Sequence, residues 1–399
     1  MKTYDFLILG AGIFGLSTAL SLLRRGYSVG ILNPEGIPHP LAASTDISKV
    51  VRMEYGSDEE YMAMAEASLQ GWHAWNDLFG DTLYHETGYL ITSSQPLEAA
   101  PHSYEATSYR LLLQKGYQPE RLKGSSLGRR FPAFAAAPYV DGFFHAKGGF
   151  AESGRVVSTL ARYARQLGAD LHQGHAAASI LTTKGRVTGV RSREGGHFAA
   201  GQVVVCAGNF TPYLLPELQP FMRVSGHPVF HLKPSRPDLF TPPQFAVFAA
   251  DIARSGWYGF PLHPSEGVVK IANHGAGLTL HPENDPRLVT AQDEAHLRAF
   301  LAQSLPALQH DPIVYTRRCC YTDTLDGHFW IDRHPEIKGL SVGSGGSGHG
   351  FKMGPVIGEL IAAAALGEVH PWSARYRWRQ LDEHTLQHEQ ARFLANRKL

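Results

Sequence analysis

Residues 4–15, YDFLILGAGIFG, place an apolar run directly before three closely spaced glycines. The run predicts a buried strand, and the leucine spacing in 13–25 predicts a helix that Gly26 ends. A second strand is predicted over 27–32. Strand, helix and strand within about 30 residues form a βαβ unit. We therefore expect the sheet that begins here to be parallel.

The three glycines fit the pattern G-x-G-x-x-G, in which each has a separate task. Gly10 allows the sharp turn, Gly12 lets the backbone approach a pyrophosphate, and Gly15 lets the helix pack closely on the strand. The free N–H groups at the start of the helix favour bound phosphates. Asn33 stands where an acidic residue usually binds the ribose, which weakens the case for NAD in particular. The motif predicts a dinucleotide site.

The rest of the chain divides into parallel-type and antiparallel-type segments. Helix and strand patterns near both ends resemble the first unit, and they cover 153–167, 200–207, 340–343 and 356–365. Alternating or apolar runs between turn residues predict antiparallel strands within 86–93, 246–260 and 267–274. The polar tail from Trp372 onward is predicted to be helical and to pack on the outside. Two discontinuous domains are expected, with an α/β class overall.

The composition is that of a globular protein with almost no net charge. Lys+Arg number 37 and Asp+Glu 36 among 399 residues, a formal net charge of +1. That balance gives no attraction to nucleic acid or acidic lipid. Because 43% of residues are hydrophobic and 18% charged, wholesale disorder is excluded. No nucleic acid, membrane or metal is expected as a partner, since neither an apolar span nor metal-ligand spacing is found.

The three cysteines favour a reducing compartment, because they cannot link a chain of this length. The first five residues lead into a strand without a cleavable signal pattern, so a cytoplasmic protein is expected. Cys319 and Cys320 are adjacent and follow two arginines. They are an inert pair, a strained disulfide, or a site where guanidinium charge favours the reactive thiolate. Cys206 is predicted to be a buried apolar residue.

Cationic residues and a second glycine-rich loop are further candidates for a site. Period-two alternation places Lys270 on one strand face with Ala272 and His274. A lysine among apolar residues either guards an edge strand or is a partly buried charge with a function. Tyr258 and Phe260 share a face of the preceding strand, where they could wall an apolar slot. Five glycines within 343–350 lie between a strand and a helix and indicate a ligand against the backbone.

Together these residues resemble the D-amino-acid-oxidase superfamily of flavoproteins, and more closely its monomeric sarcosine oxidase branch, which oxidises N-methyl amino acids. The resemblance covers nearly the whole chain and is densest at 319–326 and 348–352. It implies a monomer with a Rossmann-type FAD-binding domain and an antiparallel-sheet substrate-binding domain. The FAD-binding domain is expected to comprise 1–80, 145–220 and 320–399, and the substrate-binding domain 81–144 and 221–319.

The resemblance also implies roles for individual residues. Cys319 matches the cysteine that holds FAD through a thioether, and Lys270 matches the lysine that assists reaction with oxygen. The residues that match carboxylate-binding positions are Arg52 and Lys352, and those that match catalytic positions around the amine are Lys49, Tyr258, His274 and Tyr321. Further cofactor contacts are expected at Gly10, Gly12, Ile13, Phe14, Gly15, Asn33, Ser44, Lys49, Ala207, Gly208, Gly346, Gly348, His349, Gly350, Phe351 and Lys352.

The implied activity is oxidation of the C–N bond of a secondary amino acid by FAD. The imine formed hydrolyses, and O2 is reduced to hydrogen peroxide. Arg52 and Lys352 would hold a carboxylate through charge-assisted hydrogen bonds. One departure concerns the substrate: residues 46–49 look more like fructosyl-amine oxidases, and Lys49 stands where sarcosine oxidase has Arg. A fructosyl-amino-acid oxidase, a flavin dehydrogenase with another acceptor, and a non-catalytic nucleotide-binding protein are therefore the alternatives.

Overall fold

The N-terminal βαβ unit forms the centre of a large sheet in the computed structural model, which describes residues 2–135, 137–382 and 388–393. Strand β1 (Thr3–Leu9) is followed by helix α1 (Ile13–Arg24) and strand β2 (Val29–Asn33). Strand β1 pairs in parallel with β2 and with β12 (His197–Val205). The prediction of a parallel sheet is confirmed.

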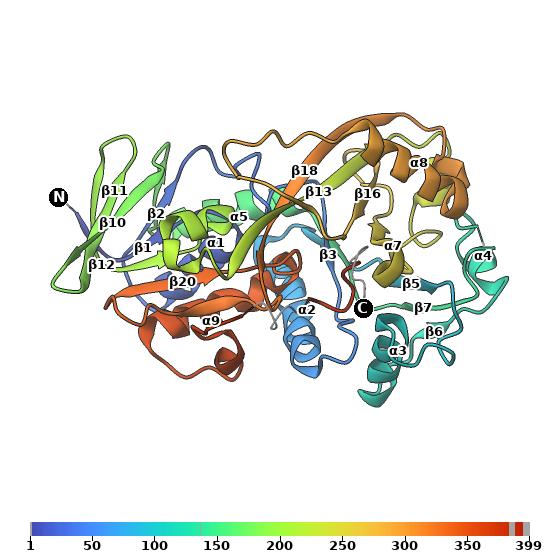
Figure 1. Cartoon of the computed structure of the whole chain (residues 1–399), viewed down its shortest axis with the longest axis horizontal. Coiled ribbons are helices and arrows are strands. Elements are labelled where there is room, and N and C mark those ends of the chain that lie inside the picture. The colour runs from blue at the N-terminus through green and yellow to red at the C-terminus, as the bar shows by residue number, and fades with distance from the viewer. Residues whose placement is uncertain (1, 136, 383–387, 394–399) are drawn as a thin grey trace.

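Within the described residues this sheet has eight strands (Figure 1). Its parallel part continues through β9 on one side and β20 on the other, and antiparallel strands extend it beyond β12 and β20. The added strands are β9 (Asp170–Gln173), β10 (Ala177–Thr183), β11 (Arg186–Ser192), β19 (Trp330–Arg333) and β20 (Leu340–Ser344). The carboxyl ends of β1, β12 and β20 therefore meet at one edge, where a nucleotide binds in such sheets.

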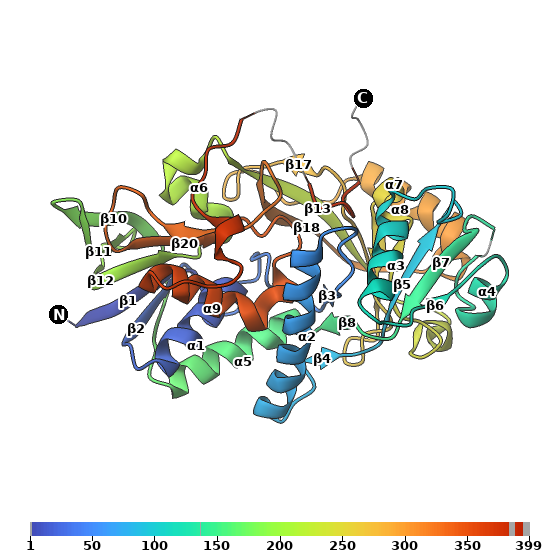
Figure 2. The ribbon, with the colours of Figure 1, turned by 90° about the horizontal axis from the view of Figure 1, so that it is seen from below.

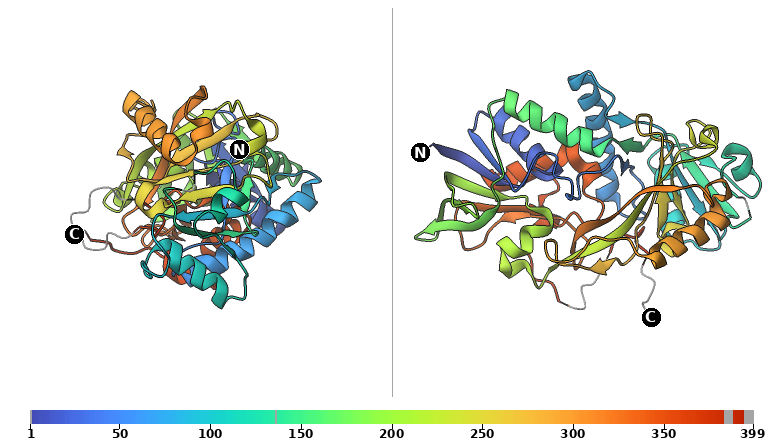
Figure 3. Two further views of the ribbon diagram at one scale, coloured as in Figure 1. Left: turned by 90° about the vertical axis from the view of Figure 1, so that its right-hand side faces the viewer. Right: turned by 90° about the horizontal axis from the view of Figure 1, so that it is seen from above.

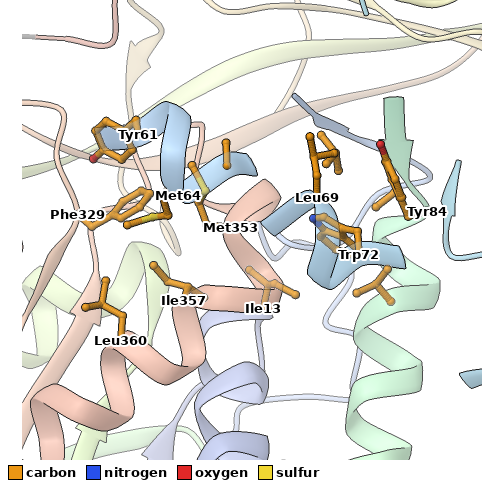
Figure 4. Close-up of a cluster of buried hydrophobic side chains, with 14 of the residues drawn as sticks. Ile13, Tyr61, Met64, Leu69, Trp72, Tyr84, Phe329, Met353, Ile357 and Leu360 are labelled. Carbon is orange, nitrogen blue, oxygen red and sulfur yellow. The ribbon is translucent and has the colours of Figure 1, made fainter. Parts of the chain in front are cut away.

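Four helices pack beside this sheet (Figure 2). They are α1, α2 (Glu59–Phe79), α5 (Ser153–Gln166) and α9 (Gly354–Leu366). Figure 4 shows their shared apolar core, in which Ile13 lies near Ile357 and Trp72. Because Ile13 is buried in this core, the start of α1 is held firmly below the glycine loop.

A second sheet of nine strands lies toward the other end of the elongated molecule (Figure 3). Its neighbours run antiparallel except for β5 and β14, which pair in parallel, so the antiparallel prediction is wrong for that pair. The predicted segment 246–260 is two strands separated by helix α7 (Ile252–Ser255). The strands are β5 (Tyr89–Ser93), β6 (Glu120–Arg121), β7 (Asp141–His145), β13 (Met222–Leu232), β14 (Val247–Ala250), β15 (Trp257–Gly259), β16 (Val269–Asn273), β17 (Leu278–Thr279) and β18 (Ile313–Thr324).

The long strands β13 and β18 pair along most of their length and reach from the second sheet toward the first (Figure 1). A small third sheet is made of β3 (Lys49–Val51), β4 (Tyr84–His85) and β8 (Gly149–Ala151). The remaining α-helices are α3 (Tyr104–Gln114), α4 (Ser126–Arg130), α6 (Thr211–Leu214) and α8 (Ala291–Ser304). The 3-10 helices are η1 (Gly208–Phe210), η2 (Pro216–Leu218), η3 (Pro237–Phe240), η4 (Pro306–Leu308), η5 (Phe351–Met353) and η6 (Ser373–Tyr376).

The C-terminal tail differs from the prediction. Among its described residues, only η6 is helical, and the side chains of Tyr376 and Ala391 are fully buried rather than outside. The rest of the predicted helix, 383–387 and 394–399, lies outside the described residues. The polar composition misled the prediction, because its charged side chains bind buried partners of opposite charge. No helix in the described part of the chain is long and apolar enough to cross a membrane.

Candidate functional site

A cavity of about 610 Å³ lies between the first sheet and strands β13 to β18, and most of the predicted site residues line it. They include residues of the two glycine loops, of β3, β15 and β18, and His274, which directly follows β16. The lining residues among those predicted are Gly10, Gly12, Ile13, Phe14, Asn33, Ser44, Lys49, Arg52, Ala207, Gly208, Tyr258, His274, Tyr321, Gly346, Gly348, His349, Gly350, Phe351 and Lys352. Gly15, Lys270 and Cys319 are not in the lining.

The first glycine loop has the geometry that its motif predicts. Gly10 has φ +105°, and a Cβ there would lie 2.5 Å from the Cys206 carbonyl oxygen. A Cβ on Gly15 would lie 1.9 Å from the Gly10 carbonyl oxygen, so helix and loop touch at this point. At Gly12 the nearest atom to such a Cβ is the Ser44 Oγ at 3.1 Å. Gly12 therefore presents its backbone to the cavity, as contact with a phosphate requires.

Two polar side chains, Ser44 and Asn33, accept hydrogen bonds from the backbone of this loop. The Ser44 Oγ accepts a hydrogen bond from the Ile13 N–H at 3.0 Å, and the first turn of α1 carries no acidic residue. The Asn33 Oδ1 accepts one from the Ala11 N–H at 3.1 Å. Asn33 thus orders the loop, while Glu35, two residues further on, lines the cavity with a carboxylate. The ribose position at Asn33 stays a prediction, and Glu35 is a second candidate that lines the same cavity.

The second glycine loop closes the opposite side of the cavity. A Cβ at Gly348, where φ is +79°, would lie 2.5 Å from the Tyr321 ring. Gly346 has no atom closer than 3.9 Å to such a position. The backbone at Gly346 therefore borders open space, whereas the Tyr321 ring packs directly against Gly348. The loop leads into η5 and α9, in agreement with the predicted order of loop and helix.

Lys270 is a buried charge in a central strand, which excludes the edge-guard interpretation. Its strand, β16, lies between β13 and β15, and the side chain is 2% exposed. The Nζ lies 2.8 Å from the Asp46 Oδ2 and also donates to the Ser48 carbonyl. Burial lowers the pKa of Lys270 to about 8, although the Asp46 charge acts in the opposite direction. The Lys49 Nζ lies 3.9 Å from the same Asp46 carboxylate, and Lys49 lines the cavity whereas Lys270 and Asp46 do not.

The two adjacent cysteines have different surroundings. The Cys319 Sγ lies 3.7 Å from the Lys49 Nζ and 3.8 Å from an Arg317 Nη. Burial alone raises the pKa of Cys319, but these two cations bring it below the ordinary value. For Cys320, burial dominates and the pKa is raised. All three cysteines are free thiols, and Cys206 is buried as expected. The geometry favours the thiolate at Cys319 alone.

Arg52 and Lys352 form a cationic end of the cavity. Arg52 lies among the rings of Tyr55, Tyr89 and Tyr104, with its guanidinium 4.8 to 5.8 Å from their centres. The Lys352 Nζ donates to the Tyr55 hydroxyl and the His349 carbonyl, both at 3.1 Å. Burial, assisted by the Arg52 charge, lowers the pKa of Lys352 to about 7. An anion bound here would raise it again, because the charged form would gain a partner.

Aromatic side chains form the wall between the cationic end and the cluster around Lys49. The rings of Tyr258 and Phe260 are 5.9 Å apart, and both line the cavity, as predicted. The His274 and Tyr321 rings are also 5.9 Å apart. Burial lowers the pKa of His274, although Glu389 acts in the opposite direction. The site therefore joins an apolar slot to a cationic end.

Two acidic residues were absent from the predicted site. Asp46 stood in a stretch that was noticed for its resemblance, but no role was assigned to it. Glu389 belongs to the tail, and its carboxylate forms ion pairs with Arg52 and with the His274 Nε2, the latter at 3.3 Å. No local sequence pattern marks either residue, because the ion pair that brings each of them to the site is with a residue more than a hundred positions away.

A parallel sheet with a glycine loop, joined to a second sheet across one elongated cavity, defines a dinucleotide-dependent enzyme of two lobes. The family described as "DAO: FAD dependent oxidoreductase" matches residues 5–364. The chain belongs to this family and is a FAD-dependent oxidoreductase. The resemblance read from the sequence, its fold class and its cofactor FAD are confirmed.

The chain is similar over almost its full length to several oxidases. It is 28% identical to L-saccharopine oxidase from Schizosaccharomyces pombe, covering 94% of this chain and 93% of that protein. It is 28% identical to peroxisomal sarcosine oxidase from Mus musculus, covering 90% and 91%. Among solved structures, fructosyl amine:oxygen oxidoreductase (Amadoriase I) from Aspergillus fumigatus has a TM-score of 0.83 at 25% identity, covering 98% of this chain and 94% of that one.

Proposed function

We propose that this enzyme oxidises the C–N bond of a secondary amino acid, as sarcosine oxidases do, and reduces O2 to hydrogen peroxide. The observation that carries the proposal is that one cavity brings together four kinds of group. Its lining includes both glycine loops, Lys49, the aromatic side chains Tyr258, Phe260 and Tyr321, and the cations Arg52 and Lys352. The similarity to enzymes named as sarcosine and saccharopine oxidases supports it.

The residues present fit FAD. The first turn of α1 carries no acidic residue and lines the cavity through Gly12, Ile13 and Phe14, where the positive end of the helix favours phosphate. Glu35 and Asn33 line the same cavity. When bound, FAD supplies the acceptor for two electrons. The residues that would hold its ring system are Gly346, Gly348 and Phe351 at the start of η5, which line the same cavity as Lys49. The thiol of Cys319 would provide a covalent link, because the nearby cations favour its thiolate form.

The chain's own groups would bind and orient the substrate. Arg52 and Lys352 would hold its carboxylate by charge-assisted hydrogen bonds. His274, Tyr258 and Tyr321 would surround the amine and exclude water from the slot. The imine that leaves this site hydrolyses in water. Catalysis would then consist mainly of holding the reacting C–N bond in a fixed position.

Lys270 would assist the reaction with oxygen as a fixed positive charge. Its Nζ is held by Asp46 and the Ser48 carbonyl, so no reorganisation is needed when negative charge develops nearby. Lys49 contacts the same Asp46 carboxylate and lines the cavity, so its ammonium group would add a second positive charge there. We further propose that the enzyme is a cytoplasmic monomer, with the FAD-binding and substrate-binding domains at the boundaries given above.

A fructosyl-amino-acid oxidase is the second candidate. Residues 46–49 favour it, because Lys49 occupies the position where sarcosine oxidase has Arg. The chemistry at the C–N bond is the same, and only the group on nitrogen differs. A dehydrogenase that passes electrons to another acceptor remains the third.

The test is a peroxide assay with sarcosine, pipecolate and fructosyl-glycine in parallel. The proposal expects peroxide from sarcosine or pipecolate, and faster oxidation of these than of fructosyl-glycine. The reverse preference selects the second candidate. Reduction of a dye without oxygen uptake selects a dehydrogenase, and no electron transfer from any amine refutes all three.

A further inference from the structure

The C-terminal segment 388–393 brings Glu389 to the cationic end of the cavity and is held by contacts of the residues that follow Glu389. Arg392 forms two hydrogen bonds of 2.7 Å to the Asp323 carboxylate of β18, and both side chains are 1% exposed. The Phe393 N–H donates to the His274 carbonyl at 3.1 Å. Next to Glu389, the Gln390 Nε2 donates to the Ser57 Oγ at 2.9 Å. The contacts of Arg392 and Phe393 hold the segment, and with it Glu389, against β18 and His274.

Glu389 forms an ion pair with the Arg52 guanidinium, the group to which the proposed function assigns the substrate carboxylate. One carboxylate oxygen pairs with the Arg52 Nη2, and the other lies 3.3 Å from the His274 Nε2. The Glu389 and Arg52 side chains are each 6% exposed. Among the described residues, Glu389 is the one carboxylate within ion-pair distance of Arg52, and the Arg52 Nη1 has no hydrogen-bond partner. A substrate carboxylate and Glu389 therefore require the same cation.

We propose that Glu389 is a specificity-determining residue, whose carboxylate competes with the carboxylate of the substrate for Arg52. The inference rests on the proposed function only in taking Arg52 as the carboxylate-binding residue. A buried guanidinium left alone is strongly unfavourable, so Glu389 gives up Arg52 only to another anion. A neutral ligand cannot take its place. The segment therefore selects ligands that bring a carboxylate, at the cost of lower affinity for each of them.

The surroundings of Glu389 agree with this competition. Although burial alone raises its pKa, the charges of Arg52 and Lys352 and the contact with His274 hold the pKa of Glu389 well below its ordinary value. The carboxylate is thus ionised, as a competitor for Arg52 has to be. If Glu389 served only to fill space, a variant with an uncharged side chain of the same shape would bind anions with the affinity of the wild type.

The experiment titrates acetate into the flavin-loaded protein and its variants by calorimetry. In Glu389→Gln, the shape is kept but the charge is lost, and we expect the dissociation constant of acetate to fall by about tenfold or more. Acetamide should show no such change, because it does not need Arg52 as an anion does. Acetate should also raise the Tm of Glu389→Gln more than that of the wild type. In this variant the acetate ion pairs with the Arg52 charge that the substitution leaves without a carboxylate partner.

Matched variants complete the test. Gln390→Ala alters the same segment at its Ser57 contact and should leave acetate binding unchanged. Glu389→Asp keeps the charge but shortens its reach, and it serves if the Gln variant does not fold; acetate should bind it more tightly than the wild type. Unchanged or weaker acetate binding in the folded Glu389 variants, or equal gains for acetamide, overturns the inference.

Turnover distinguishes this inference from the proposed function. With sarcosine, Glu389→Gln should lower KM, because the substrate carboxylate no longer competes with a charged side chain for Arg52. If the wild type oxidises no amine but the acetate titrations follow the expected pattern, the proposed function fails and the competition at Arg52 stands. If amine oxidation is found and the titrations show no gain, the reverse holds.

Discussion

Replacing Lys270 by Met should separate two effects that the structure assigns to one charge. The Nζ lies 2.8 Å from the Asp46 Oδ2, with side chains 2% and 1% exposed. Breaking a buried pair by removing one partner costs about 3–5 kcal/mol of stability. Asp46 keeps contacts with the His231 Nε2 at 3.3 Å and with Lys49 at 3.9 Å, so we expect the lower end of that range. The free energy of unfolding should fall by about 3 kcal/mol.

The second effect of the same change concerns oxygen. Loss of one fixed charge aimed at developing negative charge costs on the order of a hundredfold in rate, or about 3 kcal/mol. Reduction of the flavin by substrate should change far less, because Lys270 is not in the cavity lining, and Arg52 and Lys352, which would hold the substrate, are unchanged. Stopped-flow mixing measures the two half-reactions separately: anaerobic reduction by the amine, then reoxidation by O2.

The double variant Lys270→Met/Asp46→Asn is the control. Removing both charges of a buried pair is often close to neutral for stability. The double variant should therefore regain most of the lost stability, while its reoxidation stays slow. If reoxidation recovers with stability, Lys270 acts through the fold alone. If Lys270→Met slows reduction and reoxidation equally, its role in the oxygen step is refuted.

Three further predictions concern the cofactor and pH. Cys319→Ser should release flavin on acid precipitation, whereas Cys320→Ser should retain it; the opposite result would assign the link to the other thiol. Gly15→Ala should lower the Tm of the apoprotein, because its Cβ would lie 1.9 Å from a carbonyl oxygen. Gly12→Ala should keep that Tm and lose bound flavin. Thermal unfolding measures the first effect, and absorption spectra measure the second. Burial lowers the pKa of Lys270 to about 8, so its charged form is present below that pH. Reoxidation should therefore be fast below about pH 8 and slow above it, and a reoxidation rate that does not change across this range would contradict the assignment.

The sequence predicted the parts of the fold that depend on local pattern. The βαβ unit could be read because leucine spacing and glycine positions lie within one short stretch. Lys270 could be noticed because a lysine breaks an apolar strand. The antiparallel prediction failed for β5 and β14, since their parallel pairing depends on the order of strands and not on either sequence.

Long-range ion pairs account for what the sequence did not reveal. The tail was predicted as an outer helix because its charged residues are typical of an exposed surface. In the structure Arg392 is paired with Asp323 on β18, and Glu389 with Arg52, so the same charges hold the tail inside. Asp46 could not be assigned either, because Lys270 lies on a distant strand. A carboxylate in a polar segment gives no local sign of its partner.

The central claim is that the cavity holds a flavin that takes two electrons from a secondary amino acid. The most direct measurement is the visible spectrum of the purified protein during anaerobic addition of sarcosine or pipecolate. The account predicts a yellow protein whose absorption bleaches on addition and returns when O2 is admitted. A colourless protein under ample FAD supply, or a flavin spectrum that no secondary amino acid changes, would contradict it.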